Sequence, residues 1–203
     1  MQDDLLIRRA QRGDNDAFEQ LLLEHQKNVY NLCYRMAGNA DDALDLSQET
    51  FLRAWRCLDQ YQFASSFSTW LYRLCSNLCI DFLRRRKRQQ AMPLTFEDAD
   101  GEEQTLSVPD PAPSPEEQTE LKLTREALAA AMAQLLPEHR AVLQLRVCEE
   151  LPYEQIAEIL DIQIGTVKSR LSRARTQLKK VLERGNFSPN ASSEFLKSEV
   201  GAK

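Results

Sequence analysis

The chain has 203 residues, of which 42% are hydrophobic and 28% are charged, a composition typical of one or two globular domains. Its apolar runs are far shorter than the roughly 20 residues of a membrane-spanning helix, and its start, MQDDLLIRRAQRGD, lacks the pattern of a secretory signal. We therefore expect a cytoplasmic protein without membrane insertion. The spacing of the five cysteines excludes a disulfide scaffold and a standard zinc finger.

The net charge of −5 is unevenly distributed along the chain. Residues 1–90 have a net charge of +1, residues 91–120 have nine acidic and no basic side chains, and residues 121–185 have a net charge of +3. This segregation is typical of a protein that binds a polyanion and carries an acidic connector. Residues 91–120 also hold five of the eight prolines, which predicts a flexible acidic linker. The residues beyond 185 are predicted to form a C-terminal tail (186–203).

The first region, residues 1–90, has apolar residues at helical spacing and no strand-like alternation. The capping-box spacing of Asp16 and Glu19 predicts the start of a long helix, and Gly38 predicts its end. Other helices are predicted at about 3–12, at 41–58, and from Ser68 into the basic run 84–88. An aromatic and serine-rich segment, YQFASSFS, separates the last two helices.

The second region, residues 121–185, is also helical in its pattern, so the predicted fold class is all-α, with two small helical domains joined by the linker. Helices are predicted at 118–135, at 138–149 with Pro137 in the first turn, near 156–160, and from Gly165 or Thr166 onward. The last two helices, their short turn and a small alanine at the crossing predict a helix-turn-helix motif.

The second helix of this motif is strongly basic on its outward face. If Val167 and Leu171 face the core, hydroxyl and cationic side chains point outward, and these are the types that contact bases and phosphates. The candidate DNA-binding residues here are Thr166, Lys168, Ser169, Ser172, Arg173 and Arg175. The alternative is a solvated basic face in an ordinary helical bundle, and for Arg175 an internal salt bridge is as good an interpretation as a phosphate contact.

At this point the sequence resembles a known family. The stretch LLPEHRAVLQLRVCEELPYEQIAEILDIQIGTVKSRLSRAR looks like the domain of bacterial sigma factors of the extracytoplasmic-function group that binds the promoter −35 element, and GTVKSRLSRAR at 165–175 is very specific to that group. Gln163 departs from the proline that is usual in the family. The resemblance implies that this helix reads the −35 element.

In the first region, Leu44, Asp45, Gln48, Glu49 and Leu52 share one face of a predicted helix by their spacing of three and four residues. Outward apolar residues inside an acidic patch favour a protein interface, and a solvated acidic face is the alternative. The segment LDLSQETFLRAW resembles the sigma-factor surface that grips the clamp helices of RNA polymerase. At position 44 the extracytoplasmic-function group commonly has an acidic residue, and this sequence has Leu44 instead. In this respect the segment resembles the corresponding segment of primary sigma factors.

The segment FASSFSTWLYRLCSNLCIDFLRRRKR resembles the reader of the promoter −10 element. That task needs aromatic stacking platforms, worth about 1–3 kcal/mol per base, and cations along the backbone of a separated strand. The candidate residues are Phe63, Ser65, Ser66, Phe67, Thr69, Trp70, Arg73, Asn77, Arg84 and Arg85. For Phe67 and Trp70, packing in the core is the alternative interpretation.

The resemblance, which covers about residues 1–185, implies an RNA polymerase sigma factor that directs promoter-specific initiation. Its implied partners are core RNA polymerase (the clamp helices of the β′ subunit and the flap of the β subunit), promoter DNA, and an anti-sigma factor able to hold it inactive at the membrane. We expect no enzyme, catalytic site, cofactor or metal, since motifs for phosphate loops, nucleophile elbows and zinc sites are missing. The alternatives are a stand-alone helix-turn-helix regulator and a sigma mimic that sequesters an anti-sigma factor.

The cysteines receive a structural interpretation. Cys33, Cys75 and Cys79 fall on predicted buried stripes, where a thiol behaves as a small hydrophobic group. The alternative is a redox switch through Cys75 and Cys79.

Overall fold

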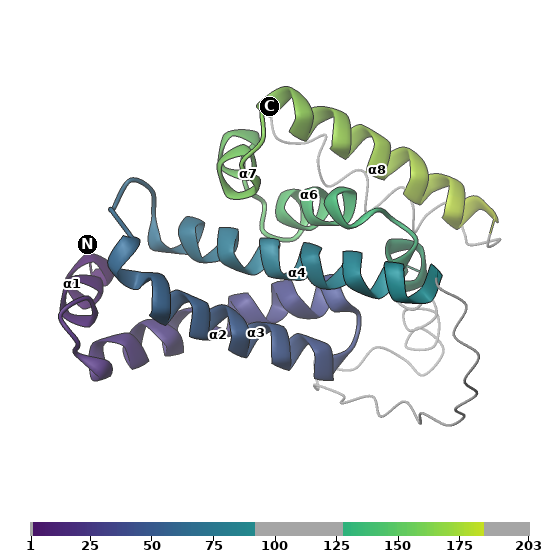
Figure 1. Cartoon of the computed structure of the whole chain (residues 1–203). Coiled ribbons are helices and arrows are strands. Elements are labelled where there is room, and N and C mark those ends of the chain that lie inside the picture. The colour runs from purple at the N-terminus through teal and green to yellow at the C-terminus, as the bar shows by residue number, and fades with distance from the viewer. Residues whose placement is uncertain (1, 92–127, 185–203) are drawn as a thin grey trace, which may run out of the picture.

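The computed structural model describes residues 2–91 and 128–184 (Figure 1). The helices are α1 (Gln2–Ala10), α2 (Asn15–Ala37), α3 (Ala40–Cys57), α4 (Phe67–Ala91), α6 (Pro137–Val147), α7 (Tyr153–Leu160) and α8 (Ile164–Arg184). A short 3-10 helix, η1 (Leu58–Gln60), follows α3, and residues 128–133 are also helical. No strand occurs in the described segments, and the predicted all-α class is confirmed. The predicted linker (91–120) and tail (186–203) lie outside the described residues, except for Ala91 at the end of α4.

The ends of α2 show how local chemistry sets helix bounds. Asp14 caps the helix, because its Oδ1 accepts a hydrogen bond from the backbone N–H of Ala17 at 3.1 Å. The predicted start at the pair Asp16 and Glu19 is therefore wrong by a fraction of a turn. The predicted end at Gly38 is confirmed: this residue has φ of 89°, a left-handed conformation that suits glycine, and its N–H donates to the Tyr34 carbonyl at 2.8 Å.

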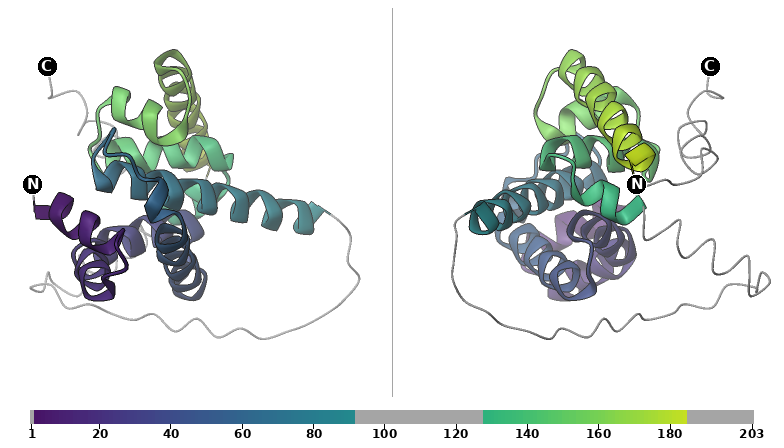
Figure 2. Two further views of the ribbon diagram at one scale, coloured as in Figure 1. Left: turned by 60° about the vertical axis from the view of Figure 1, so that its left-hand side comes forward. Right: turned by 90° about the vertical axis from the view of Figure 1, so that its right-hand side faces the viewer.

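Helix α4 lies between two layers of helices (Figure 1). One side packs against α2 and α3, and the other packs against α6 and α7. Burial on two sides explains why α4 buries Leu71, Leu78 and Ile80, which do not share a single stripe. Its C-terminal part projects beyond the helices of the first region (Figure 2). The exposed strip left on α4 includes Arg73 and Asn77.

The two regions pack against each other, and their buried apolar side chains form one cluster. Polar contacts cross the boundary as well: Glu149 accepts hydrogen bonds from the Arg35 guanidinium at 2.7 Å and from the Tyr72 hydroxyl at 2.9 Å. The buried Arg140 guanidinium donates to the Arg35 carbonyl at 2.8 and 3.2 Å. The sequence pattern does not predict this docking, because the residues involved are about a hundred positions apart.

Among the helices of residues 2–91 and 128–184, none combines the length and the apolar character that crossing a membrane requires.

Candidate nucleic-acid and protein interfaces

The turn between α7 and α8 has the geometry of a helix-turn-helix. Asp161 ends α7 in the left-handed conformation, with φ of 50°, and its N–H points back to the carbonyls of Ala157 and Glu158. The N–H of Ile162 donates to the Ala157 carbonyl at 3.0 Å. These bonds satisfy the last carbonyls of α7 and turn the chain sharply into α8.

Gln163 begins α8 through its backbone. Its carbonyl accepts hydrogen bonds from the N–H groups of Thr166 at 2.8 Å and Val167 at 3.1 Å. A proline at this position offers the same carbonyl, so glutamine in its place keeps the start of the helix. The bonds that begin α8 therefore do not depend on the side chain of residue 163.

The outward face of α8 is the one that the sequence predicts. Val167, Leu171 and Ala174 are buried against the other helices of the second region. The candidate DNA-binding residues Lys168, Ser169, Ser172 and Arg173 are exposed, and Thr166 and Arg175 are half-buried. Seven basic residues and one acidic residue lie between Gly165 and Arg184. The exposed surface thus combines positive charge with hydroxyl groups, which suits phosphates and base edges.

The loop before α4 is tied down at several points. The Tyr61 hydroxyl donates to the Ser65 carbonyl at 2.6 Å, and the Gln11 side-chain amide donates to the carbonyls of Leu58 at 2.9 Å and Tyr61 at 3.0 Å. Phe63 sits in the left-handed region with φ of 58°, and the Arg8 guanidinium lies 4.5 Å from its ring centroid. A left-handed phenylalanine is strained by about 1–2 kcal/mol, so the loop is held in an unusual shape by its neighbours.

Three of the predicted −10 residues lie inside the fold. Phe67, Thr69 and Trp70 are buried, and the rings of Phe67 and Trp70 contact each other at 5.6 Å. Core packing, the alternative left open for the two aromatics, is therefore what the structure shows. Ser66 is exposed and starts α4, because its Oγ accepts from the Thr69 N–H at 3.1 Å. Phe63 and Ser65 are half-buried at the loop surface.

The outer surface of α4 carries the remaining −10 candidates, Arg73, Asn77, Arg84 and Arg85, which are all exposed. Arg84 already has two carboxylate partners, Asp81 at 3.4 Å and Glu138 at 2.8 Å. Since Glu138 belongs to α6, the docked second region neutralises a cation that the sequence assigns to DNA.

An apolar groove of about 820 Å³ runs between α2 and α3. Three of the five predicted polymerase-binding residues line it: Leu44, Gln48 and Leu52. Leu44 and Leu52 are 51% and 50% exposed, a large fraction for leucine. The groove confirms that these side chains face outward.

Charged residues of both signs accompany the groove, because Lys27 lines it and the predicted polymerase-binding residues Asp45 and Glu49 belong to the same helix, α3, as its Leu44 wall. Asp45 is exposed, and Glu49 is half-buried and pairs with Arg53 one turn further on, at 2.8 Å. The hydrogen bond from Arg53 lowers the pKa of the Glu49 carboxyl below its ordinary value. The apolar lining suits a partner that presents apolar side chains, and Asp45 is the exposed acidic side chain of this helix face that has no Arg53 pairing.

Sequence reasoning missed the opposite wall of the groove, formed by Phe18, Leu22 and Tyr30 of α2. It also missed Trp55, which is 39% exposed and lies 4.8 Å from the Phe18 ring. Trp55 follows Leu52 by three residues, so helical spacing did carry a signal for it. The α2 wall has no such signal, because half-buried apolar residues look like core in a sequence.

Two groups of potential metal ligands occur within the described residues. One consists of Asp3, Glu24 and His25, and His25 Nε2 lies 3.7 Å from Asp3 Oδ2 while its ring contacts Phe67 at 5.2 Å. These contacts tie α2 to α1 and to α4, which gives Asp3 and His25 a structural role. The other group consists of three buried cysteines.

Comparisons with known proteins show the family of the chain. Family models described as Sigma-70 region 2 and Sigma-70 region 4 match residues 21–89 and 125–178. The chain is 34% identical to the ECF RNA polymerase sigma factor SigW of Bacillus subtilis, over 87% of this chain and 94% of that protein. It is 39% identical to the RNA polymerase sigma-H factor of Pseudomonas aeruginosa, over 90% of this chain and 94% of that protein.

Among solved structures, the sigma factor RpoE of Bartonella quintana, in complex with the anti-sigma factor NepR, matches with a TM-score of 0.58 and 26% identity over 82% of this chain and 96% of that chain. The structure of CnrH in complex with the cytosolic domain of CnrY has the same fold, with a TM-score of 0.64 and 23% identity over 91% of this chain and 99% of that chain.

Because both regions of the chain match sigma-70 models, the fold is that of a transcription initiation factor of the sigma-70 family. Within that family, the chain belongs to the extracytoplasmic-function group of RNA polymerase sigma factors.

Proposed function

We propose that this chain binds core RNA polymerase and brings it to promoters that it recognises at two elements, with α8 reading the −35 element. The observation that carries this proposal is the outward face of α8, where hydroxyl and cationic side chains stand on the second helix of a helix-turn-helix. Polymerase performs the chemistry, and this chain supplies promoter specificity and strand opening.

The proposed polymerase contact is the groove between α2 and α3. Its apolar walls on two neighbouring helices suit the apolar face of a helical partner, and the clamp helices of the β′ subunit provide such a partner. Leu44 and Leu52 supply apolar contact, while Asp45 and Glu49 favour basic side chains on the partner. The second region is proposed to bind the flap of the β subunit.

For the −10 element, we propose that the buried and the exposed candidate residues have different roles. Phe67, Thr69 and Trp70 form the scaffold of the loop, because they are buried. The exposed Arg73, Asn77 and Arg85 are proposed to hold the strand, together with the loop residues Phe63, Ser65 and Ser66. Arg84 joins them when Glu138 releases it.

An anti-sigma factor is a further proposed partner. The related RpoE of Bartonella quintana was crystallised with one. In the absence of polymerase, the exposed apolar groove of this chain is free to bind such a partner. We propose that the protein works in the cytoplasm and that such a partner holds it inactive, at the membrane where the partner is a membrane protein.

Run-off transcription tests the proposal directly. The purified chain is added to bacterial core polymerase with fragmented genomic DNA from its own source, and the transcripts are sequenced. New start sites that share two spaced upstream elements support the sigma function. Without new starts, DNA binding by the chain alone would instead identify a stand-alone regulator, and binding to neither DNA nor polymerase would identify a sigma mimic.

A matched pair of variants separates the groove from general surface effects. Leu52→Arg places a charge in the groove and is expected to abolish polymerase binding and transcription. Leu23→Arg introduces the same charge at a leucine of α2 that is 56% exposed and does not line the groove, and it should leave both unchanged. Equal effects of the two variants would place the polymerase contact elsewhere.

A further inference from the structure

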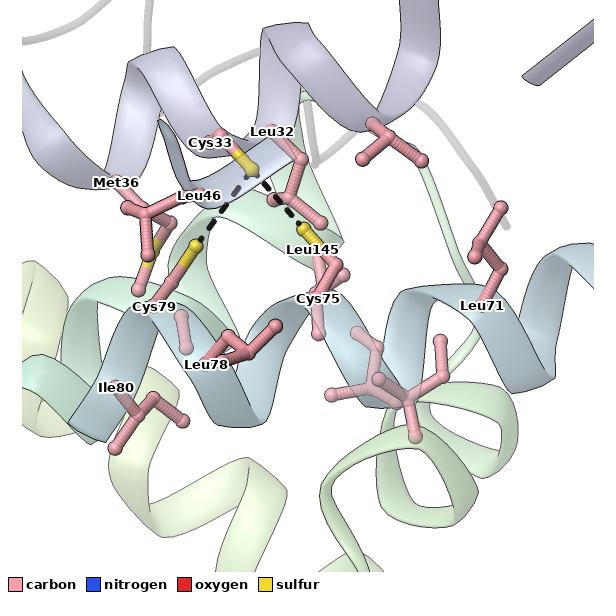
Figure 3. Packing of buried hydrophobic residues seen from close by; sticks show 14 of the residues in the cluster. Leu32, Cys33, Met36, Leu46, Leu71, Cys75, Leu78, Cys79, Ile80 and Leu145 are labelled. Atoms are coloured by element: carbon pink, nitrogen blue, oxygen red, sulfur yellow. Dashed lines mark hydrogen bonds between the residues drawn. The ribbon is translucent and has the colours of Figure 1, made fainter. Parts of the chain in front are cut away.

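Three cysteines meet in the core of the first region. Cys33 of α2 faces Cys75 and Cys79 of α4, and all three side chains are fully buried. The Sγ atom of Cys33 lies 3.4 Å from that of Cys75 and 3.9 Å from that of Cys79, and the three sulfur atoms lie within 4.8 Å of one another (Figure 3). Cys75 and Cys79 are one helical turn apart, but Cys33 is 42 residues away in sequence, so only the fold assembles the cluster.

Most of the side chains around the sulfur atoms are apolar, and the buried polar groups that act on them are the Thr50 hydroxyl and the Arg140 guanidinium. Figure 3 shows Leu32, Leu46, Leu78 and Leu145 around the cluster, and each of these side chains is buried. Such a shell keeps water and competing ligands away from a bound ion.

A thiolate is the form of cysteine that binds metals, so a metal ion that enters the cluster displaces the protons of the thiols that bind it.

The distances fit a single metal ion. A metal–sulfur bond of about 2.3 Å places three ligands of a trigonal site about 4.0 Å apart, close to the observed 3.4 and 3.9 Å. Zinc prefers four ligands, and within the described residues this group consists of three sulfur atoms alone. Soft ligands in a set of three suit a soft monovalent ion instead.

We propose that Cys33, Cys75 and Cys79 form a binding site for one soft, thiophilic metal ion of the Cu(I) class. On binding, the three thiols release their protons to the buffer, and the negative charge that remains on the three thiolates and the monovalent ion is offset in part by the nearby Arg140 cation. The ion joins α2, which lines the groove, to α4, which carries the exposed strip of Arg73 and Asn77. Occupancy therefore stabilises the first region. The site stands on the geometry of the cluster and does not depend on the promoter function.

The test is an anaerobic titration of the reduced full chain with Cu(I). The chain carrying Cys57→Ala and Cys148→Ala serves as the reference, because both residues are outside the cluster and only the three cluster thiols remain. It is expected to retain about one copper per chain after gel filtration, to gain a thiolate-to-copper absorption band, and to melt at a higher temperature with copper. Adding Cys75→Ala should remove all three effects.

X-ray absorption at the copper edge keeps the test independent of how well the Cys75→Ala chain folds. In the reference chain, three sulfur neighbours at about 2.3 Å are expected. Two sulfur neighbours, nitrogen or oxygen ligands, no retained copper in the reference chain, or copper retention that Cys75→Ala leaves intact would each overturn the proposal.

Discussion

Phe63 has a strained backbone conformation in the loop before α4. Its left-handed backbone, with φ of 58°, persists because contacts around it fix the loop, including the Arg8 guanidinium over its ring and the two hydrogen bonds from the Gln11 amide. Strain of this kind is found where a chain must present groups in a defined way. Here it holds Ser65 and Ser66 at the surface before α4. None of this is visible in the spacing of YQFASSFS.

Replacing Gln11 tests whether its two hydrogen bonds stabilise the loop. Gln11→Glu keeps the size of the side chain but places a carboxylate against the carbonyls of Leu58 and Tyr61, which need a donor. The variant should lose about 1–3 kcal/mol of unfolding free energy, measured by urea denaturation. The same change at Gln20, an exposed residue of α2, is the control and should have little effect. Equal stability of the two variants would show that the hydrogen bonds from Gln11 do not stabilise the protein.

The burial of Phe67 and Trp70 could not be predicted from the residue types alone. An aromatic beside serines fits both a stacking platform and a core residue, and the decision depends on contacts such as that with Tyr61, whose ring lies 5.8 Å from Phe67 and 5.4 Å from Trp70. The reverse holds for Val167 and Leu171, where helical spacing alone predicted burial correctly.

At the scale of elements, most helix positions follow from local rules. Pro137 in the first turn of α6, Gly38 after α2, and the apolar stripe of α8 placed these helices to within a few residues. The start of α2 differed because two aspartates compete for the cap, and only the backbone geometry shows that Asp14 takes it.

The cap of α2 makes stability depend on pH. The hydrogen bond from the Ala17 N–H, and then the one from Arg9, lower the pKa of the Asp14 carboxyl. The ionised form therefore stabilises the fold above the unfolded pKa of about 3.9, and this contribution is lost as the pH falls through the lower, folded value. Asp14→Asn keeps an acceptor without titrating, so its stability should fall less than that of the wild type on acidification. Asp16→Asn is the control in urea titrations, and a wild-type slope in Asp14→Asn would contradict the assignment.

For α8, the expectation concerns base reading. Arg173 is exposed in the middle of the outward face, so Arg173→Ala should weaken binding to the −35 element by about 1–3 kcal/mol and relax the preference for one base pair. Arg184→Ala removes an exposed arginine from the far end of the same helix and controls for charge. Competition binding of the holoenzyme to promoter variants measures both. Equal weakening on all sequences would make Arg173 a phosphate contact.

At the scale of the whole molecule, the docking of the second region on the first is the feature that sequence patterns do not predict. Arg35 belongs to α2, Tyr72 belongs to α4, and Glu149 follows α6, so these residues meet only in the folded chain. Periodicity reports which face of a helix is apolar, but it does not report which other helix covers that face. The burial of α4 on two sides, and with it the thiol cluster, follows from this docking and from the packing of α2.

Glu149 is the natural place to test the docking. Its side chain is 13% exposed and serves both Arg35 and Tyr72. Glu149→Lys should cost about 1–3 kcal/mol of docking, between the values for surface and buried ion pairs, and increase the radius of gyration in small-angle X-ray scattering. Glu150→Lys makes the same change in charge at the exposed neighbour and should leave the radius unchanged. An unchanged radius in both variants would mean that other contacts hold the regions together.

The ion pairs between the two regions also bear on how promoter binding responds to ionic strength. Salt weakens protein–DNA contacts, because counterions compete for the phosphates. Salt also screens the pairs of Arg84 with Glu138 and of Arg35 with Glu149, and so raises the fraction of molecules whose Arg84 is released. The two effects oppose each other, so the affinity of this protein for its promoter should fall less steeply with salt than the number of phosphate contacts implies. With Glu149→Gln the docking is already weakened, and the full dependence on salt should return.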